Sequence, residues 1–141
     1  MVNFIHTADW QIGMKGGGLG NAGQIVRETR IDSIRNILQT AEKKNADFIL
    51  VCGDLFEDNM VSQEEVTKVV KILNKYEKVP IYILPGNHDY LGPGCVYNRD
   101  IFKHINHVTI LDSYDRIAID DVFLYPCPVF HRSMVNELTN R

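Results

Sequence analysis

Apolar and polar positions along the chain alternate between short hydrophobic runs and longer stretches that repeat every three to four residues. The short runs have the length of β-strands and cover residues 2–6, 47–52 and 81–84. The longer stretches cover residues 24–44 and a segment opened by Ser62 and Glu65, which have the spacing of a capping box; their period predicts amphipathic helices. Strands that alternate with helices predict an α/β fold with a parallel sheet and right-handed crossovers.

The pattern weakens after the third predicted strand. Residues 98–104 predict a short helix, and short strands are predicted at 108–111, 116–119 and 122–125, the last two joined by a hairpin turn. Residues 131–141 have the pattern of a helix start without a stop signal. We therefore expect residues 1–141 to be the N-terminal portion of a single domain, with the downstream half and any capping region lying beyond them.

Composition narrows the class of protein. The 141 residues suffice for one domain, and 45% hydrophobic with 23% charged residues is ordinary for a globular protein. The net charge of −3 lacks the basic excess with which dedicated nucleic-acid-binding modules neutralise phosphates. This charge argues against a pure binding protein but less against an enzyme, because bound divalent cations attract phosphate themselves.

The sequence shows neither a targeting signal nor a cysteine framework. No apolar run approaches the ~18 residues of a membrane span, and the first residues do not resemble a signal peptide. The three cysteines form no C-x-x-C pair, so neither a disulfide framework nor a zinc knuckle is indicated. We expect a cytoplasmic location and no membrane partner.

Polar residues follow each of the three predicted strands. Asp9 follows the first, Asp54 the second, and Asn87 with His88 the third. Because parallel strands end at the same edge of a sheet, these side chains should converge there. Two carboxylates, an amide oxygen and an imidazole suit a divalent metal. Each loop alone is as well explained by a helix cap or a turn, and the three together favour a metal site.

These motifs carry a resemblance to a known family. The sequence D-x-H/Q-x-G, followed by G-D-L-F and G-N-H-D, resembles the calcineurin-like metallophosphoesterases. The segments at 6–10, 53–56 and 124–130 are most similar to the SbcD/Mre-type nuclease subunit of DNA double-strand-break repair complexes. The resemblance covers essentially the whole chain and implies a layered sheet flanked by helices, present here as its truncated N-terminal half.

The resemblance also implies a site with two divalent metal ions, usually manganese. Asp9 would bind the first ion, Asp54 would bridge both, and Asn87 would bind the second through its side-chain oxygen. His88 would face the scissile phosphate and protonate or orient the leaving oxygen. Hydrolysis would proceed by in-line attack without a covalent enzyme intermediate.

Three further positions stand close to these motifs. Gln11 stands where the family usually has histidine, and an amide oxygen is a poorer donor for a transition metal, so it either ligates weakly or holds a metal-bound water. Glu57 is a candidate to accept a hydrogen bond from the His88 ring, although a solvated loop glutamate is an equal alternative. Asp89, which closes the G-N-H-D motif, is expected in the same supporting layer around the ligands.

The family completes its metal site with a further histidine and a G-H-x-H segment, neither of which matches this sequence. His104, His107 and His131 are expected to be surface or packing residues. The fragment alone is therefore predicted to bind metal poorly and to be inactive. A glycine-rich segment at 15–20 lacks P-loop spacing and predicts a flexible loop. Arg27 and Arg30 after it are candidates for nucleic-acid contacts or simply a solvated helix face.

The sequence favours a manganese-dependent nuclease that acts on DNA in double-strand-break repair. The resemblance implies a coiled-coil ABC-type ATPase subunit as its partner and a possible homodimer. One alternative is a phosphoesterase of the same fold that acts on a cyclic nucleotide or a phosphoprotein. Another is a non-catalytic scaffold whose metal site has decayed, as Gln11 could indicate.

Overall fold

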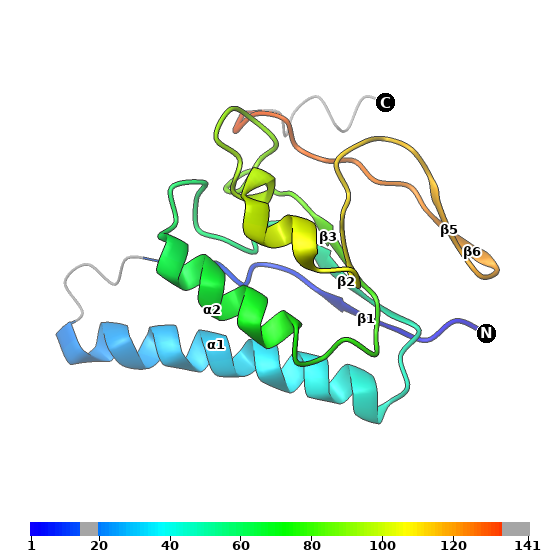
Figure 1. Cartoon of the computed structure of the whole chain (residues 1–141), viewed down its shortest axis with the longest axis horizontal. Helices are drawn as coiled ribbons and strands as arrows, with labels where there is room; N and C mark the ends of the chain where they lie inside the picture. The colour runs from blue at the N-terminus through cyan, green and yellow to red at the C-terminus, as the bar shows by residue number, and fades with distance from the viewer. Residues whose placement is uncertain (15–19, 134–141) are drawn as a thin grey trace.

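The computed structural model describes residues 1–14 and 20–133 of the chain. The elements of its first part are β1 (Phe4–Thr7), α1 (Gly20–Lys43), β2 (Phe48–Cys52), α2 (Gln63–Leu73) and β3 (Ile81–Leu84). They are followed by the 3₁₀ helices η1 (Val96–Asn98) and η2 (Asp100–His104) and by the short strands β4 (Val108–Ile110), β5 (Ile117–Ile119) and β6 (Val122–Leu124). Figure 1 shows their arrangement along the chain.

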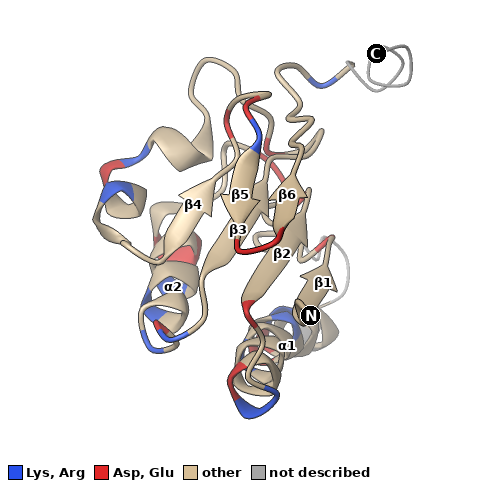
Figure 2. Ribbon diagram, turned by 90° about the vertical axis from the view of Figure 1, so that its right-hand side faces the viewer, with Lys and Arg blue, Asp and Glu red and all other residues tan. Residues whose placement is uncertain are grey.

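The first four strands form one parallel sheet in the order β1-β2-β3-β4 (Figure 2). Thr7 pairs with Val51, and Cys52 pairs with Leu84, so the carboxyl ends of the first three strands lie almost level. The predicted α/β fold with a parallel sheet is confirmed. Among the described residues, no helix is both long and apolar enough to cross a membrane.

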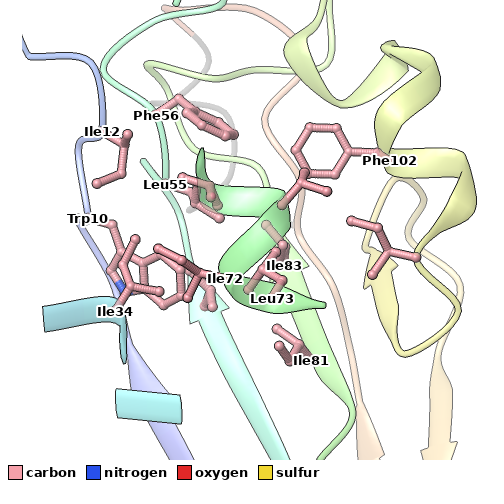
Figure 3. Packing of buried hydrophobic residues seen from close by; sticks show 14 of the residues in the cluster. Trp10, Ile12, Ile34, Leu55, Phe56, Ile72, Leu73, Ile81, Ile83 and Phe102 are labelled. Carbon is pink, nitrogen blue, oxygen red and sulfur yellow. The ribbon is translucent and has the colours of Figure 1, made fainter. Parts of the chain in front are cut away.

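The core lies between this sheet and the two helices. Alternate residues of the two central strands are fully buried on one face, where they meet the apolar stripes of α1 and α2 (Figure 3). The sheet contributes Ile49, Val51, Ile81 and Ile83, and the helices contribute Ile34, Leu38, Ala41, Val66, Val69 and Leu73. On the opposite face, Phe48 stacks on Phe4 and meets Tyr82 edge-on.

Both predicted helices are present. The start of α2 was predicted correctly, and the start of α1 was not. Ser62 caps α2 by accepting a hydrogen bond from the amide of Glu65 (3.2 Å), as its spacing predicts. Helix α1 begins at Gly20, four residues before the predicted start. Tertiary packing overrides the low helix propensity of glycine here, since Gly23 is buried. The remainder of the glycine-rich segment, residues 15–19, lies outside the described residues.

The short elements after β3 also occur where the pattern indicates them, with one difference in type. The predicted helix at 98–104 is a pair of 3₁₀ turns, η1 and η2. Strands β5 and β6 form a separate antiparallel hairpin, which stands away from the two helices (Figure 1). Asp120 in its turn has a left-handed backbone, with φ of +49°. Most of the helix predicted at 131–141 falls outside the described residues.

A test of this core is the replacement of Leu73, which is fully buried at the end of α2. Leu73→Ala removes apolar contacts and leaves a cavity, so we expect a loss of about 2–5 kcal/mol in the free energy of unfolding, measured by urea denaturation. The control is Ile25→Ala on α1, where the side chain is 63% exposed. An equal loss in both variants would contradict the packing described here.

Candidate metal centre

The loops that follow β1 and β2 run side by side and are joined by main-chain hydrogen bonds. The amide of Asp9 donates to the carbonyl of Gly53 (3.1 Å), and the amide of Gln11 donates to the carbonyl of Asp54 (2.9 Å). Further main-chain bonds extend this contact along both loops. The hydrogen bonding of the sheet thus continues beyond its strands and fixes the two loops in register.

The loop after β3 packs against the loop after β2. The amide of His88 donates to Oδ1 of Asp54 (2.9 Å). A Cβ on Gly86 would stand 2.5 Å from the Asp54 amide nitrogen and 2.9 Å from Cα of Gly53, so only glycine fits. Gly53 has a left-handed backbone, with φ of +85°, which glycine adopts readily. At Gly86 the close approach of the neighbouring backbone, and not a left-handed conformation, requires glycine.

Three of the residues predicted to bind metal have left-handed backbones. The φ angles are +54° at Asp9, +46° at Gln11 and +51° at Asp54. A non-glycine residue in this conformation costs about 1–3 kcal/mol and persists only where the surrounding structure holds it. Aspartate tolerates the conformation through local hydrogen bonds of its short side chain, and glutamine does so less readily. Such strain clusters at functional sites, which supports a site at this edge of the sheet.

The predicted metal ligands differ in exposure. Asp54 is buried, with 9% of its surface exposed, whereas Gln11 and Asn87 are half-buried and Asp9 is exposed. Asp54 therefore lies deepest, held by the amide of His88, and Asp9 lies at the solvent edge. The three loops meet where the alternation of strands and helices predicts.

The imidazole of His88 is held by a main-chain atom. Its Nδ1 lies 2.7 Å from the carbonyl oxygen of Glu57. A carbonyl can only accept, so Nδ1 carries a proton, and Nε2 has a lone pair in the neutral ring and a proton in the cation. From the sequence, Glu57 is a candidate acceptor with a solvated loop glutamate as an equal alternative, and in the structure the ring contacts the main-chain carbonyl of this residue rather than its carboxylate. Residue type could not reveal this, because every residue offers a carbonyl.

Asp89 is fully buried and ties the third loop to its surroundings. Its carboxylate accepts hydrogen bonds from the amides of Gly86 (2.7 Å) and Phe56 (3.1 Å) and from the hydroxyl of Tyr97. Burial raises the pKa of Asp89, and these three hydrogen bonds oppose the rise. Burial also raises the pKa of Tyr97 well above its usual value, so the hydroxyl remains a donor. Asp89 thus supports the site through the loop backbones.

Comparison with known proteins identifies the family of this chain. The sequence profile of the calcineurin-like phosphoesterases matches residues 2–132. The chain belongs to this family. The resemblance drawn from the motifs is therefore confirmed.

Curated relatives of this member of the calcineurin-like phosphoesterase family include a nuclease subunit. The chain is 30% identical over 91 residues to the SbcD subunit of the nuclease SbcCD of Staphylococcus epidermidis, covering 62% of this chain and 23% of that protein. It is 28% identical to the uncharacterized metallophosphoesterase YhaO of Bacillus subtilis, covering 64% and 24%. It is 26% identical to the DNA double-strand break repair protein Mre11 of Saccharolobus solfataricus, covering 91% and 33%. The chain spans about a quarter to a third of the length of these relatives.

The donor set of this chain fits a divalent cation in part. Oε2 of Glu57 is the one buried side-chain oxygen or nitrogen of the described residues without a hydrogen-bond partner, and a nearby cation or its bound water would satisfy it. Within the same residues, no three His, Cys, Asp or Glu side chains gather into a ligand set. Two carboxylates with the amides of Gln11 and Asn87 are an oxygen-rich set that would bind a divalent cation weakly without further donors.

Some residues that support the site carry no local sequence signal. The side chain of Asn59 accepts a hydrogen bond from the amide of Val96 and donates to the carbonyl of Tyr90, both 2.9 Å away. Arg99 donates to the carbonyls of Asn59 and Val61. These contacts join positions more than 30 residues apart, so a reading of local pattern could not find them.

The bond from Tyr97 to Asp89 provides a test of this support. Tyr97→Phe keeps the ring but leaves a buried carboxylate with one donor fewer, so we expect a loss of about 1–3 kcal/mol in the free energy of unfolding. Chemical denaturation of the two proteins measures it. Tyr125→Phe, at a side chain that is 70% exposed, is the matched control and should change nothing measurable. Equal stability of wild type and Tyr97→Phe would show that Asp89 does not depend on this donor.

Proposed function

We propose that this chain is the N-terminal, metal-binding portion of a manganese-dependent nuclease that hydrolyses phosphodiester bonds in DNA. The observation that carries the proposal is the convergence of three loops bearing Asp9, Asp54 and the Asn87-His88 pair, with strained backbones at the first two. Relatives named as a nuclease subunit and as a double-strand break repair protein support DNA as the substrate. The proposal includes double-strand-break repair and a cytoplasmic location.

The residues of the chain divide the work between binding and proton transfer. Asp9 and Gln11 would hold one cation, Asn87 a second, and Asp54 both. When bound, the cations would offset charge on the phosphate oxygens and lower the pKa of an attacking water. The buried position of Asp54 and its bond from the His88 amide keep this carboxylate in place as the substrate enters.

His88 would act on the leaving group. Because Nδ1 is committed to the Glu57 carbonyl, the proton on Nε2 of the imidazolium is the one available to the leaving oxygen. The fixed ring has its orientation before substrate binds, which lowers the entropic cost of reaching a reactive geometry. Glu57 and Asp89 would support the site without contacting the phosphate.

Substrate charge has to be met by the metals rather than by a basic surface. Lys and Arg alternate with Asp and Glu on the ribbon in Figure 2, and the net charge of the chain is −3. The staphylococcal relative is named as one subunit of the nuclease SbcCD. We therefore propose that a partner subunit, a coiled-coil ABC-type ATPase, contributes to DNA binding, and that the protein forms a homodimer.

The proposal predicts manganese-dependent cleavage of linear DNA by the full-length protein. His88→Ala should lower the rate of cleavage about 10²- to 10⁴-fold, the range for loss of a general acid. His104→Ala is the matched control, since His104 is an exposed histidine on η2, and it should cleave as wild type does. Chelation of the metal should abolish cleavage by all three proteins.

The alternatives give different results in the same assay. A wild type that cleaves bis-p-nitrophenyl phosphate but not DNA would replace the nuclease with a small-substrate phosphoesterase. A wild type that binds manganese and cleaves neither would contradict catalysis and favour a scaffold. Equal rates for His88→Ala and wild type on DNA would remove His88 from the reaction.

A further inference from the structure

Arg30 of α1 reaches back to the loop that carries Asp9 and Gln11. Its Nη1 donates to the carbonyl of Trp10 (3.0 Å) and, at a longer distance, to that of Gln11 (3.4 Å). Its Nη2 lies 3.6 Å from the sulfur of Met14. The arginine is half-buried, and its position differs from the solvated helix face or nucleic-acid contact considered from the sequence.

The loop needs such an attachment because it is strained and only partly packed. Asp9 and Gln11 are left-handed, and their amides are held on one side by the loop after β2. An open cleft of about 340 Å³ lies between this loop and α1 beside the buried Trp10, and Asp9, Trp10, Arg30 and Ile34 are among the residues that line it. Packing alone therefore leaves the loop room to relax, and the Arg30 guanidinium fixes its carbonyls from the helix side.

The glutamine at position 11 makes this attachment more important. An amide oxygen is a weaker ligand than imidazole, and its longer side chain has more rotamers to lose on binding. A backbone held in the binding conformation before the metal arrives reduces that cost. The flat guanidinium can reach two carbonyls at once, which a lysine ammonium on a flexible stem does less well.

We propose that Arg30 is a positioning residue for the metal site, which holds the Asp9–Gln11 loop in its strained conformation by hydrogen bonds to the carbonyls of Trp10 and Gln11. The inference rests on the proposed function, because it assigns Asp9 and Gln11 to one of two cation sites. Arg30 acts through the backbone and has no contact with substrate in this role.

Manganese titration of the metal-free full-length protein by calorimetry tests the inference. Arg30→Met should weaken one class of Mn²⁺ site about 10- to 100-fold, the range for loss of a residue that supports a ligand, and leave the other class unchanged. Arg30→Lys should fall between Arg30→Met and wild type. Arg35→Met, which removes the same charge from a surface pair with Asp32 on the same helix, should titrate as wild type.

A selective effect separates positioning from general stability. Thermal unfolding of the metal-free variants reports stability, and loss of both classes of site in step with it would overturn the inference. Two unchanged sites in Arg30→Met would also overturn it. If Arg30→Met does not fold, Arg30→Lys decides by the same selective criterion. A wild type that binds no manganese would instead contradict the proposed function, and the inference would fall with it.

Discussion

The site depends on main-chain hydrogen bonds that extend the parallel sheet beyond the ends of its strands. The register of β1, β2 and β3 brings three loops level, and the bonds from Asp9 and Gln11 hold the first two of these loops together. A parallel sheet alone would bring the loops to one edge without fixing their spacing. The continued pairing adds that constraint for the first two loops, and the close approach of Gly86 and the hydrogen bonds of the buried Asp89 carboxylate attach the third loop to them.

The helices and strands could be predicted from the sequence where their apolar pattern or their capping residue is visible in it. The apolar run at 81–84 is β3 itself, and Ser62 caps α2 as its spacing indicates. The start of α1 could not be predicted, because burial of Gly23 outweighs glycine's poor propensity and no neighbouring residue reveals that burial.

The candidate site also contains residues that could be predicted from the sequence and residues that could not. Motif residues such as Asp54 and His88 follow strands whose apolar runs are visible, so their meeting could be predicted. The residues that hold these motif residues and their loops in place could not be predicted. Tyr97 and Arg30 act over long sequence separations, on a carboxylate in one case and on two carbonyls in the other. Every residue has a main-chain carbonyl, so the sequence shows the donor side chain but does not show which carbonyl accepts its hydrogen bond.

Several features at this edge of the sheet destabilise the folded chain. Left-handed backbones at Asp9, Gln11 and Asp54 cost free energy, and so does the buried Glu57 oxygen without a partner. A bound cation would recover part of this cost, because it binds only the folded arrangement of the loops. By linkage, the gain in stability would be set by the affinity of the folded chain for the cation.

The hydrogen bond between His88 and the Glu57 carbonyl has a consequence for how the family can vary. Since the acceptor belongs to the main chain, no substitution at position 57 deletes it, and the side chain there is free to change without turning the imidazole. The orientation of the imidazole and the side chain at position 57 can therefore change independently of each other. A substitution at position 57 could therefore change the charge near the His88 imidazole while the hydrogen bond that orients the ring is kept.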